Sequence, residues 1–183
     1  MKVRLALATA LAGALLVSMS GAQAAPPVMD GKKVKVLTKK VVTGTTQNMT
    51  DFVFGFDPEL CDDPKHCVTI PFVYAPAKGI KGGLMFTATW TQQVSDFDLY
   101  VVQVDKKGNG VDVGHCGGST FTSEKVYLAP AELKKNTKYV MVINQFRSVA
   151  DTVTGKVEIN VPSTVKTTVP AAVDDVAVVN CTL

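Results

Sequence analysis

The sequence predicts an all-β protein, an antiparallel β-sandwich of about eight to ten strands. Two observations favour this fold class. Apolar and polar residues alternate with a period of two in several segments, which places one face of each strand on a core and the other toward solvent. Short clusters of glycine, asparagine and serine separate these segments and are typical of turns. Because β-branched residues dominate and helical periodicity is weak, we expect two packed sheets.

The expected strands are defined by this alternation and by the turns between them. Residues 84–91 alternate apolar side chains with methionine and threonine, and 153–161 repeat the arrangement. Residues 68–74 also alternate, although Pro71 indicates an edge strand or a bulge. Residues 106–110 are expected to form a hairpin loop with glycine or asparagine at positive φ. In chain order, the predicted strands are 33–42, 68–74, 84–91, 97–104, 120–128, 138–146, 153–161 and 173–181.

The first 24 residues predict a secretory signal peptide. Lys2 and Arg4 precede an uncharged apolar run, residues 5–17, and the chain then continues Ala22-Gln23-Ala24, the small-x-small pattern that signal peptidase accepts. The apolar run is shorter than the roughly 20 residues of a membrane-spanning helix. We therefore expect cleavage after Ala24 and a secreted, extracellular protein whose mature form has no membrane span.

The mature chain is expected to begin with a flexible lead-in, residues 25–31, followed by a single β-sandwich domain, residues 32–183. Cleavage would remove two of the 19 basic residues and none of the 16 acidic ones, which leaves the mature chain nearly neutral. This balance does not favour nucleic acid as a partner, because nucleic-acid-binding proteins concentrate basic charge on one face. A local run of lysines either contacts anionic polymers or protects an edge strand from pairing. These lysines are Lys32, Lys33, Lys35, Lys39 and Lys40.

Four cysteines lie in the mature part, and an even number in an exported chain predicts two disulfides. Three pairings are open to the sequence. We favour Cys61–Cys67 as a local link and Cys116–Cys181 as a long-range one. In the loop-closure model, these bonds would contribute about 2 and about 4 kcal/mol of stability. The alternative is a zinc site, but the cysteine spacings are not C-x-x-C.

Three segments carry a motif pattern that resembles a known family. They are residues 86–91, then Asp96-Phe97-Asp98-Leu99-Tyr100-Val101, then 139–144. A strand, an Asp-x-Asp-Leu-Tyr motif and a late Tyr-x-x-x-Val strand in this order resemble the bacterial pre-peptidase C-terminal domain, over roughly residues 68–161. The resemblance implies a jelly-roll-like β-sandwich that often follows the catalytic domain of a secreted peptidase. Some members bind calcium, and some bind insoluble substrates such as collagen. Here we expect the module to stand alone.

Asp96 and Asp98 are the candidate metal ligands. They are two residues apart, so on a strand they project to the same face, together with Tyr100. Two carboxylates could ligate Ca²⁺, which takes six to eight oxygens. The remaining oxygens would come from backbone carbonyls or from other loops, for example from Asp57, Asp62 and Asp63. The alternative is a structural role in which one or both carboxylates accept backbone N–H groups at the strand entry and fix the loop 92–95.

The sequence shows no recognised set of catalytic residues. It has no G-x-S-x-G elbow and no glycine-rich phosphate loop that opens a helix. We therefore expect a secreted, non-catalytic binding or adhesion module for an extracellular polysaccharide or protein, with Ca²⁺ as its one candidate cofactor. Two alternatives stay open. The protein could be a small secreted hydrolase that uses carboxylates such as Asp96 and Asp98, or an accessory or inhibitory partner of a separate secreted peptidase.

Overall fold

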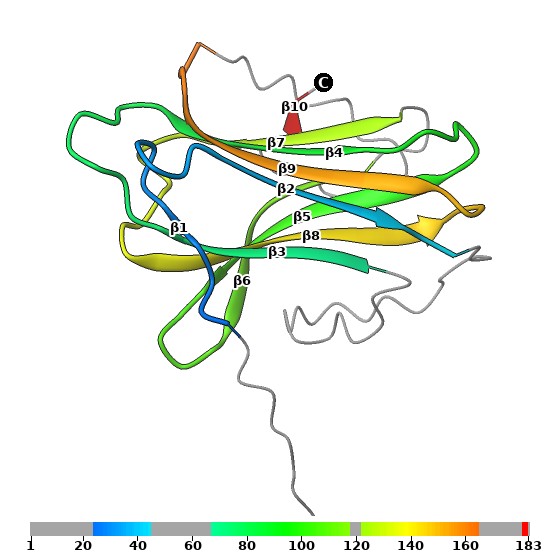
Figure 1. Ribbon diagram of the computed structural model, residues 1–183, viewed down its shortest axis with the longest axis horizontal. Coiled ribbons are helices and arrows are strands. Elements are labelled where there is room, and N and C mark those ends of the chain that lie inside the picture. The colour runs from blue at the N-terminus through cyan, green and yellow to red at the C-terminus, as the bar shows by residue number, and fades with distance from the viewer. Residues whose placement is uncertain (1–23, 45–66, 118–121, 165–180, 183) are drawn as a thin grey trace, which may run out of the picture.

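The computed structural model describes residues 24–44, 67–117, 122–164 and 181–182 (Figure 1). These residues form ten strands, and no helix among them is long and apolar enough to cross a membrane. The strands are β1 (Val28–Met29), β2 (Val36–Val42), β3 (Cys67–Tyr74), β4 (Gly83–Thr89), β5 (Asp96–Val104), β6 (Gly110–Cys116), β7 (Ser123–Leu128), β8 (Thr137–Arg147), β9 (Thr152–Val161) and β10 (Cys181–Thr182).

The strands form two five-stranded sheets that stack face to face (Figure 1). One sheet has the order β1-β3-β8-β5-β6, and the other has the order β10-β7-β4-β9-β2. Every neighbouring pair is antiparallel except β1 with β3. The predicted all-β antiparallel sandwich is therefore confirmed.

The connectivity of the eight strands from β2 to β9 is that of a jelly roll. β2 pairs with β9, β3 with β8, β4 with β7, and β5 with β6. These pairs nest inside one another along the chain, as in a long hairpin that is folded over into two sheets. The pairings β4–β9 and β5–β8 join the folded halves. A double-sheet arrangement of eight strands with this order is a jelly roll.

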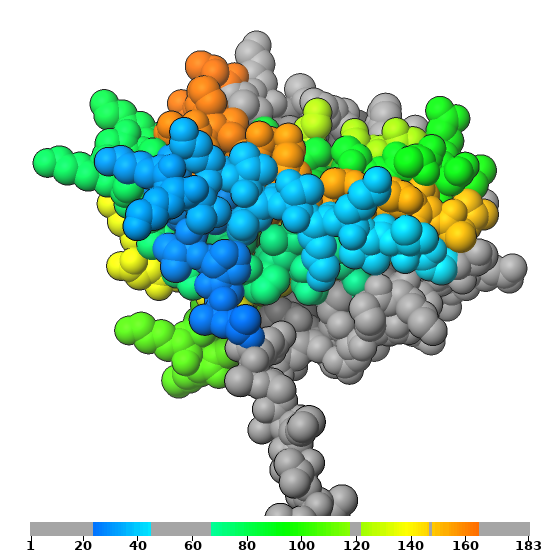
Figure 2. Space-filling view, in the orientation of Figure 1, coloured from blue at the N-terminus to red at the C-terminus, as the bar shows by residue number. Residues whose placement is uncertain are grey.

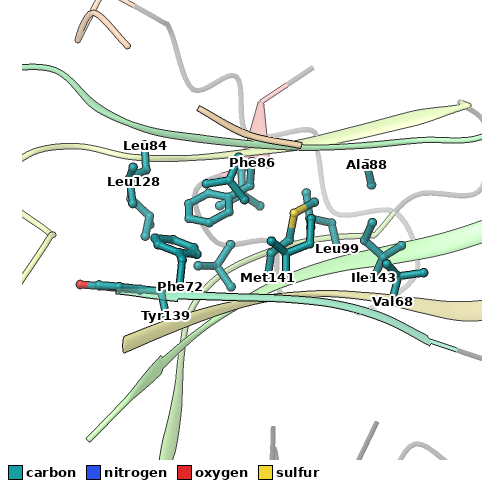
Figure 3. Packing of buried hydrophobic residues seen from close by; sticks show 14 of the residues in the cluster. Val68, Phe72, Leu84, Phe86, Ala88, Leu99, Leu128, Tyr139, Met141 and Ile143 are labelled. Carbon is teal, nitrogen blue, oxygen red and sulfur yellow. The ribbon is translucent and has the colours of Figure 1, made fainter. Parts of the chain in front are cut away.

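The hydrophobic core lies between the two sheets (Figure 3). Phe86 on β4 faces Phe72 on β3, with ring centroids 6.1 Å apart, and Phe72 stacks on Tyr139 of β8 at 5.9 Å. All three side chains are fully buried. The period-two alternation therefore identified the inward faces of β3 and β4 correctly. Pro71 is tolerated because β1 pairs with β3 only beyond this position.

Seven predicted strands are confirmed as β2 to β5 and β7 to β9. The eighth, 173–181, lies outside the described residues apart from Cys181. The expected hairpin loop joins β5 to β6, and Gly108 within it has a φ of 92°. The strand β6 that follows is absent from the predicted set.

The N-terminal segment differs from the expected flexible lead-in, residues 25–31. Val28–Met29 form β1 in parallel with β3, and the Met29 side chain is fully buried in the core. Asp30 then accepts hydrogen bonds from the backbone N–H groups of residues 32–34. The expectation is therefore wrong from Val28 onward, because a two-residue strand is too short to produce a recognisable alternation.

The described cysteines are oxidised. Cys67 and Cys116 are both disulfide-bonded, whereas Cys61 and the side chain of Cys181 lie outside what the structure describes. Two strands, β8 and β5, separate β3 from β6 in the sheet, so the Cα atoms of Cys67 and Cys116 lie about 14 Å apart. Because a disulfide cannot span that distance, the two do not pair with each other. Cys61–Cys67 with Cys116–Cys181 stays the predicted pairing, and the contact of β10 with β6 supports it.

A candidate metal centre at the edge of the sandwich

Three carboxylates converge where the two sheets meet beside β6. Asp96 and Asp98 come from β5 in one sheet, and Glu124 comes from β7 in the other. One oxygen from each side chain lies within 4.8 Å of the other two. The cluster therefore combines two residues that the sequence singled out with a third that it did not.

The alternation of β5 explains how Asp96 and Asp98 reach this position. Phe97 and Leu99 are buried in the core, whereas Asp96, Asp98 and Tyr100 are half-buried on the other face of the strand. The predicted shared face of these three side chains is confirmed. The loops that carry Asp57, Asp62 and Asp63 lie outside the described residues.

Glu124 reaches the cluster from the inner face of β7. It lies on the same face of the strand as the buried residues Val126 and Leu128, and only 3% of its surface is exposed. Its Oε2 accepts a hydrogen bond from the Leu99 backbone N–H at 2.8 Å. Because Leu99 belongs to β5, this bond joins the two sheets. The sequence could have revealed Glu124, because it shows a glutamate at an inward position of a strand.

The chain that leaves β6 passes directly over Asp98. A Cβ atom at Gly117 would lie 2.7 Å from Oδ1 of Asp98, closer than Cβ contacts in folded proteins. A residue larger than glycine at position 117 would therefore displace the carboxylate. The position of Asp98 depends on β5 and on this glycine together.

The cluster has a strongly negative electrostatic environment. Burial raises the pKa of Asp98 to about 7, the negative charge of Asp96 adds to this rise, and His115 partly offsets it. Burial also raises the pKa of Tyr100, with further contributions from Asp98 and other acidic neighbours. Ionising the whole cluster at neutral pH is unfavourable unless a positive charge enters it.

His115 lies beside this cluster and is held by its own carboxylate. Its Nδ1 lies 2.7 Å from Oδ2 of Asp112, and its ring lies 5.8 Å from that of Tyr100 between centroids. His115 and Asp112 are three positions apart on β6. The arrangement fixes the imidazole ring against Tyr100.

The three carboxylates fit a calcium ion in donor type and spacing. Ca²⁺–oxygen distances are about 2.3–2.6 Å, so two oxygens on one ion can be up to about 5 Å apart. The observed limit of 4.8 Å lies within this range. Calcium prefers carboxylate oxygens, and three such groups could provide several of its six to eight ligands. Asp96, Asp98 and Glu124 are the residues that would hold it.

The loop before β5 is held mainly by a residue that the sequence did not single out. The Asp151 carboxylate accepts the backbone N–H groups of Thr91 and Gln92, and the Trp90 indole N–H donates to the Ser95 carbonyl at 3.0 Å. Burial alone would raise the pKa of Asp151, but its hydrogen bonds outweigh burial and lower it. Asp151 therefore performs much of the loop-fixing role that was the structural alternative for Asp96 and Asp98.

Comparisons with known proteins add a weak structural likeness. No protein-family model and no curated protein matches the chain. Among solved structures, the chain is similar to a mitogen derived from Yersinia pseudotuberculosis, with 9% sequence identity and a TM-score of 0.37. The match covers 80% of this chain and 92% of that one. The assignment of the fold rests on the strand pairing described above.

Proposed function

We propose that this protein is a secreted, non-catalytic binding module whose sandwich edge is organised by a bound calcium ion. The observation that carries the proposal is the convergence of Asp96, Asp98 and Glu124 from two sheets within 4.8 Å. Like charges so close together destabilise the fold unless a cation or a proton compensates them. A divalent cation would compensate them and would also join β5 to β7.

Two features support export. The predicted signal peptide would be cut after Ala24, and the first described strand begins only at Val28, so cleavage leaves every described strand intact. The oxidised state of Cys67 and Cys116 agrees with an extracellular or periplasmic environment, where disulfides persist. The resemblance to the pre-peptidase C-terminal domain supports an extracellular polysaccharide or protein as the partner.

A calcium titration of the mature protein by isothermal calorimetry tests the proposal. We expect saturable binding of one ion, lost in Asp98→Asn and in Glu124→Gln, because each variant removes one negative ligand while keeping the side-chain shape. Glu158→Gln is the matched control, because Glu158 lies outside the cluster and pairs with Lys156. Absence of binding at millimolar calcium, or equal binding by all four proteins, would contradict the proposal.

A carboxylate-dependent hydrolase is the second candidate, and one observation favours it. A half-buried Asp98 with a pKa raised to about 7 beside Asp96 resembles the paired carboxylates of acid–base catalysis. The 4.8 Å limit is well below the about 6.5–9.5 Å of inverting glycosidases but close to the about 5–5.5 Å of retaining ones. However, Glu124 is nearly inaccessible to a substrate. Turnover of any polysaccharide or peptide in a substrate panel, lost in Asp98→Asn, would favour the hydrolase over the binding module.

A further inference from the structure

We propose that the outer face of the sheet β10-β7-β4-β9-β2 binds an acidic polysaccharide, a linear glycan that carries regularly spaced carboxylate or sulfate groups. This inference rests on the proposed binding function and names the class of its partner. It concerns the face of the sandwich that points away from the core, and not the carboxylate cluster.

Lysine and threonine side chains form two rows across this face. Their order follows from the register of β2, β9, β4 and β7, in which residues on neighbouring strands lie directly opposite each other. They point outward because the residues that alternate with them on β4 and β9 are buried in the core. The first row is Lys40, Thr154 and Thr89, and the second is Lys156, Thr87 and Lys125.

The spacing of the three lysines suits an extended polymer. Lys125 and Lys156 are two strands apart, so their backbone positions lie about 10 Å from each other. Lys40 lies one strand and two residues from Lys156, at about 8 Å. The three lysines therefore follow a bent path across the sheet, with Thr87 between Lys125 and Lys156. Ammonium groups can pair with the acidic groups of a glycan, and hydroxyls can bond to its sugar hydroxyls.

Among the described residues, the net charge on this face is positive, although the predicted mature chain is nearly neutral. The segment before β2 adds three exposed lysines, Lys32, Lys33 and Lys35, beside this sheet, and Figure 2 shows this segment and β2 (blue to cyan) running beside β9 (orange). The acidic residue on this face, Glu158, pairs with Lys156 at 2.8 Å, and Lys156 still exposes 41% of its side chain. The carboxylates of Asp96, Asp98 and Glu124 lie on other strands or point inward.

Lys39 shows that the lysine run has two separate roles. It lies between Leu37 and Val41, which pack against the core, and its Nζ donates to the Thr69 carbonyl of β3 at 3.1 Å. This bond spans the open side of the sandwich and blocks the edge strand β2 from pairing with another chain. Lys40, the next residue, points the other way and belongs to the proposed binding face.

Acidic glycans fit this face better than nucleic acids do. Single-stranded nucleic acids are bound through aromatic side chains on which bases stack, and neither row contains an aromatic residue. Tyr127, the aromatic residue on the same face of β7, is buried. Rows of hydroxyl and ammonium groups can instead bond to a polymer that carries hydroxyl and acidic groups along its whole length.

The test compares retention of matched variants on immobilised heparin, alginate, neutral dextran and duplex DNA, in EDTA. We expect the wild-type protein to be retained on heparin or alginate and not on dextran. The triple variant Lys40→Gln/Lys125→Gln/Lys156→Gln should lose at least about fivefold in affinity, since each exposed ion pair contributes modestly. The control Lys106→Gln/Lys107→Gln/Lys134→Gln changes the net charge equally, on loops away from this face, and should stay within twofold of wild type.

Three results would overturn the inference: no retention of the wild type on either acidic glycan, equal losses in the two triple variants, or DNA binding as strong as glycan binding. Circular dichroism and urea unfolding establish that both variants are folded. The glycan proposal and the calcium proposal can fail independently of each other. Retention in EDTA without any calcium binding would refute the metal site alone, and calcium binding without retention would refute the glycan face alone.

Discussion

Removing the charge of Asp98 should stabilise the metal-free protein at neutral pH, although the substitution alters a buried site. Burial and the negative charge of Asp96 raise the pKa of Asp98 from 3.8 to about 7 in the folded state. Between these values the folded protein binds more protons than the unfolded chain does. Its stability is therefore full below about pH 4, decreases as the pH rises toward 7, and levels off above 7.

The magnitude follows from the shift of about three pH units. At 1.36 kcal/mol per unit, the ionised Asp98 carboxylate lowers the free energy of unfolding by up to about 4 kcal/mol. The amide of the Asp98→Asn variant carries no charge, so this variant should exceed the wild type in stability by up to this amount at pH 8 and by little at pH 4. Ionising this one half-buried carboxylate would then cost an amount comparable with a large part of the stability of a small domain.

Urea unfolding in EDTA at several pH values between 4 and 8 measures this difference. The free energy of unfolding of the wild type should decrease relative to Asp98→Asn as the pH rises, and added calcium at pH 8 should restore it in the wild type only. A difference between the two proteins that does not change with pH, or a wild type that gains relative stability toward pH 8, would refute the reasoning.

Three other predictions concern individual contacts. Gly117→Ala should weaken calcium binding about tenfold or more in calorimetry, because the added Cβ would lie 2.7 Å from Oδ1 of Asp98. The control Gly44→Ala, whose Cβ would meet no atom within 4 Å, should bind calcium normally. Equal affinities of the two variants would count against the site. Asp151→Ala should lower stability by about 1–3 kcal/mol in urea, because it leaves the part-buried N–H groups of Thr91 and Gln92 without their charged acceptor; a change below about 0.5 kcal/mol would contradict this role. Phe72→Ala should cost about 3–5 kcal/mol, measured in the same way, because the fully buried ring leaves a cavity; a cost near 1 kcal/mol would show that the core collapses around it.

The sequence predicted those parts of the fold that depend on local alternation. The inward faces of β3, β4 and β9, and the shared face of Asp96, Asp98 and Tyr100, all follow from a period of two that each strand displays by itself. The hairpin between β5 and β6 followed from the glycine and asparagine of its loop. Packing into two sheets followed because each of these strands has one apolar face to bury.

The remaining features depend on contacts between distant segments. Met29 is buried because β1 pairs with β3, and two residues give no periodic signal. Glu124 joins the candidate site only because the jelly-roll connection places β7 of one sheet against β5 of the other. Asp151 holds two residues that lie 60 and 59 positions before it. The inward position of Glu124 on its strand is a local signal, but no local pattern reports which segment it meets, and the sequence found only two of the three clustered carboxylates.

The central claim is that Asp96, Asp98 and Glu124 hold one calcium ion between the two sheets. Anomalous X-ray diffraction from crystals of the mature protein grown with calcium, or with terbium in its place, tests this claim most directly. The account predicts one anomalous peak at about 2.3–2.6 Å from a carboxylate oxygen of each of the three residues. A map from a saturated crystal with no peak at this position, and with the three carboxylates still together, would contradict it.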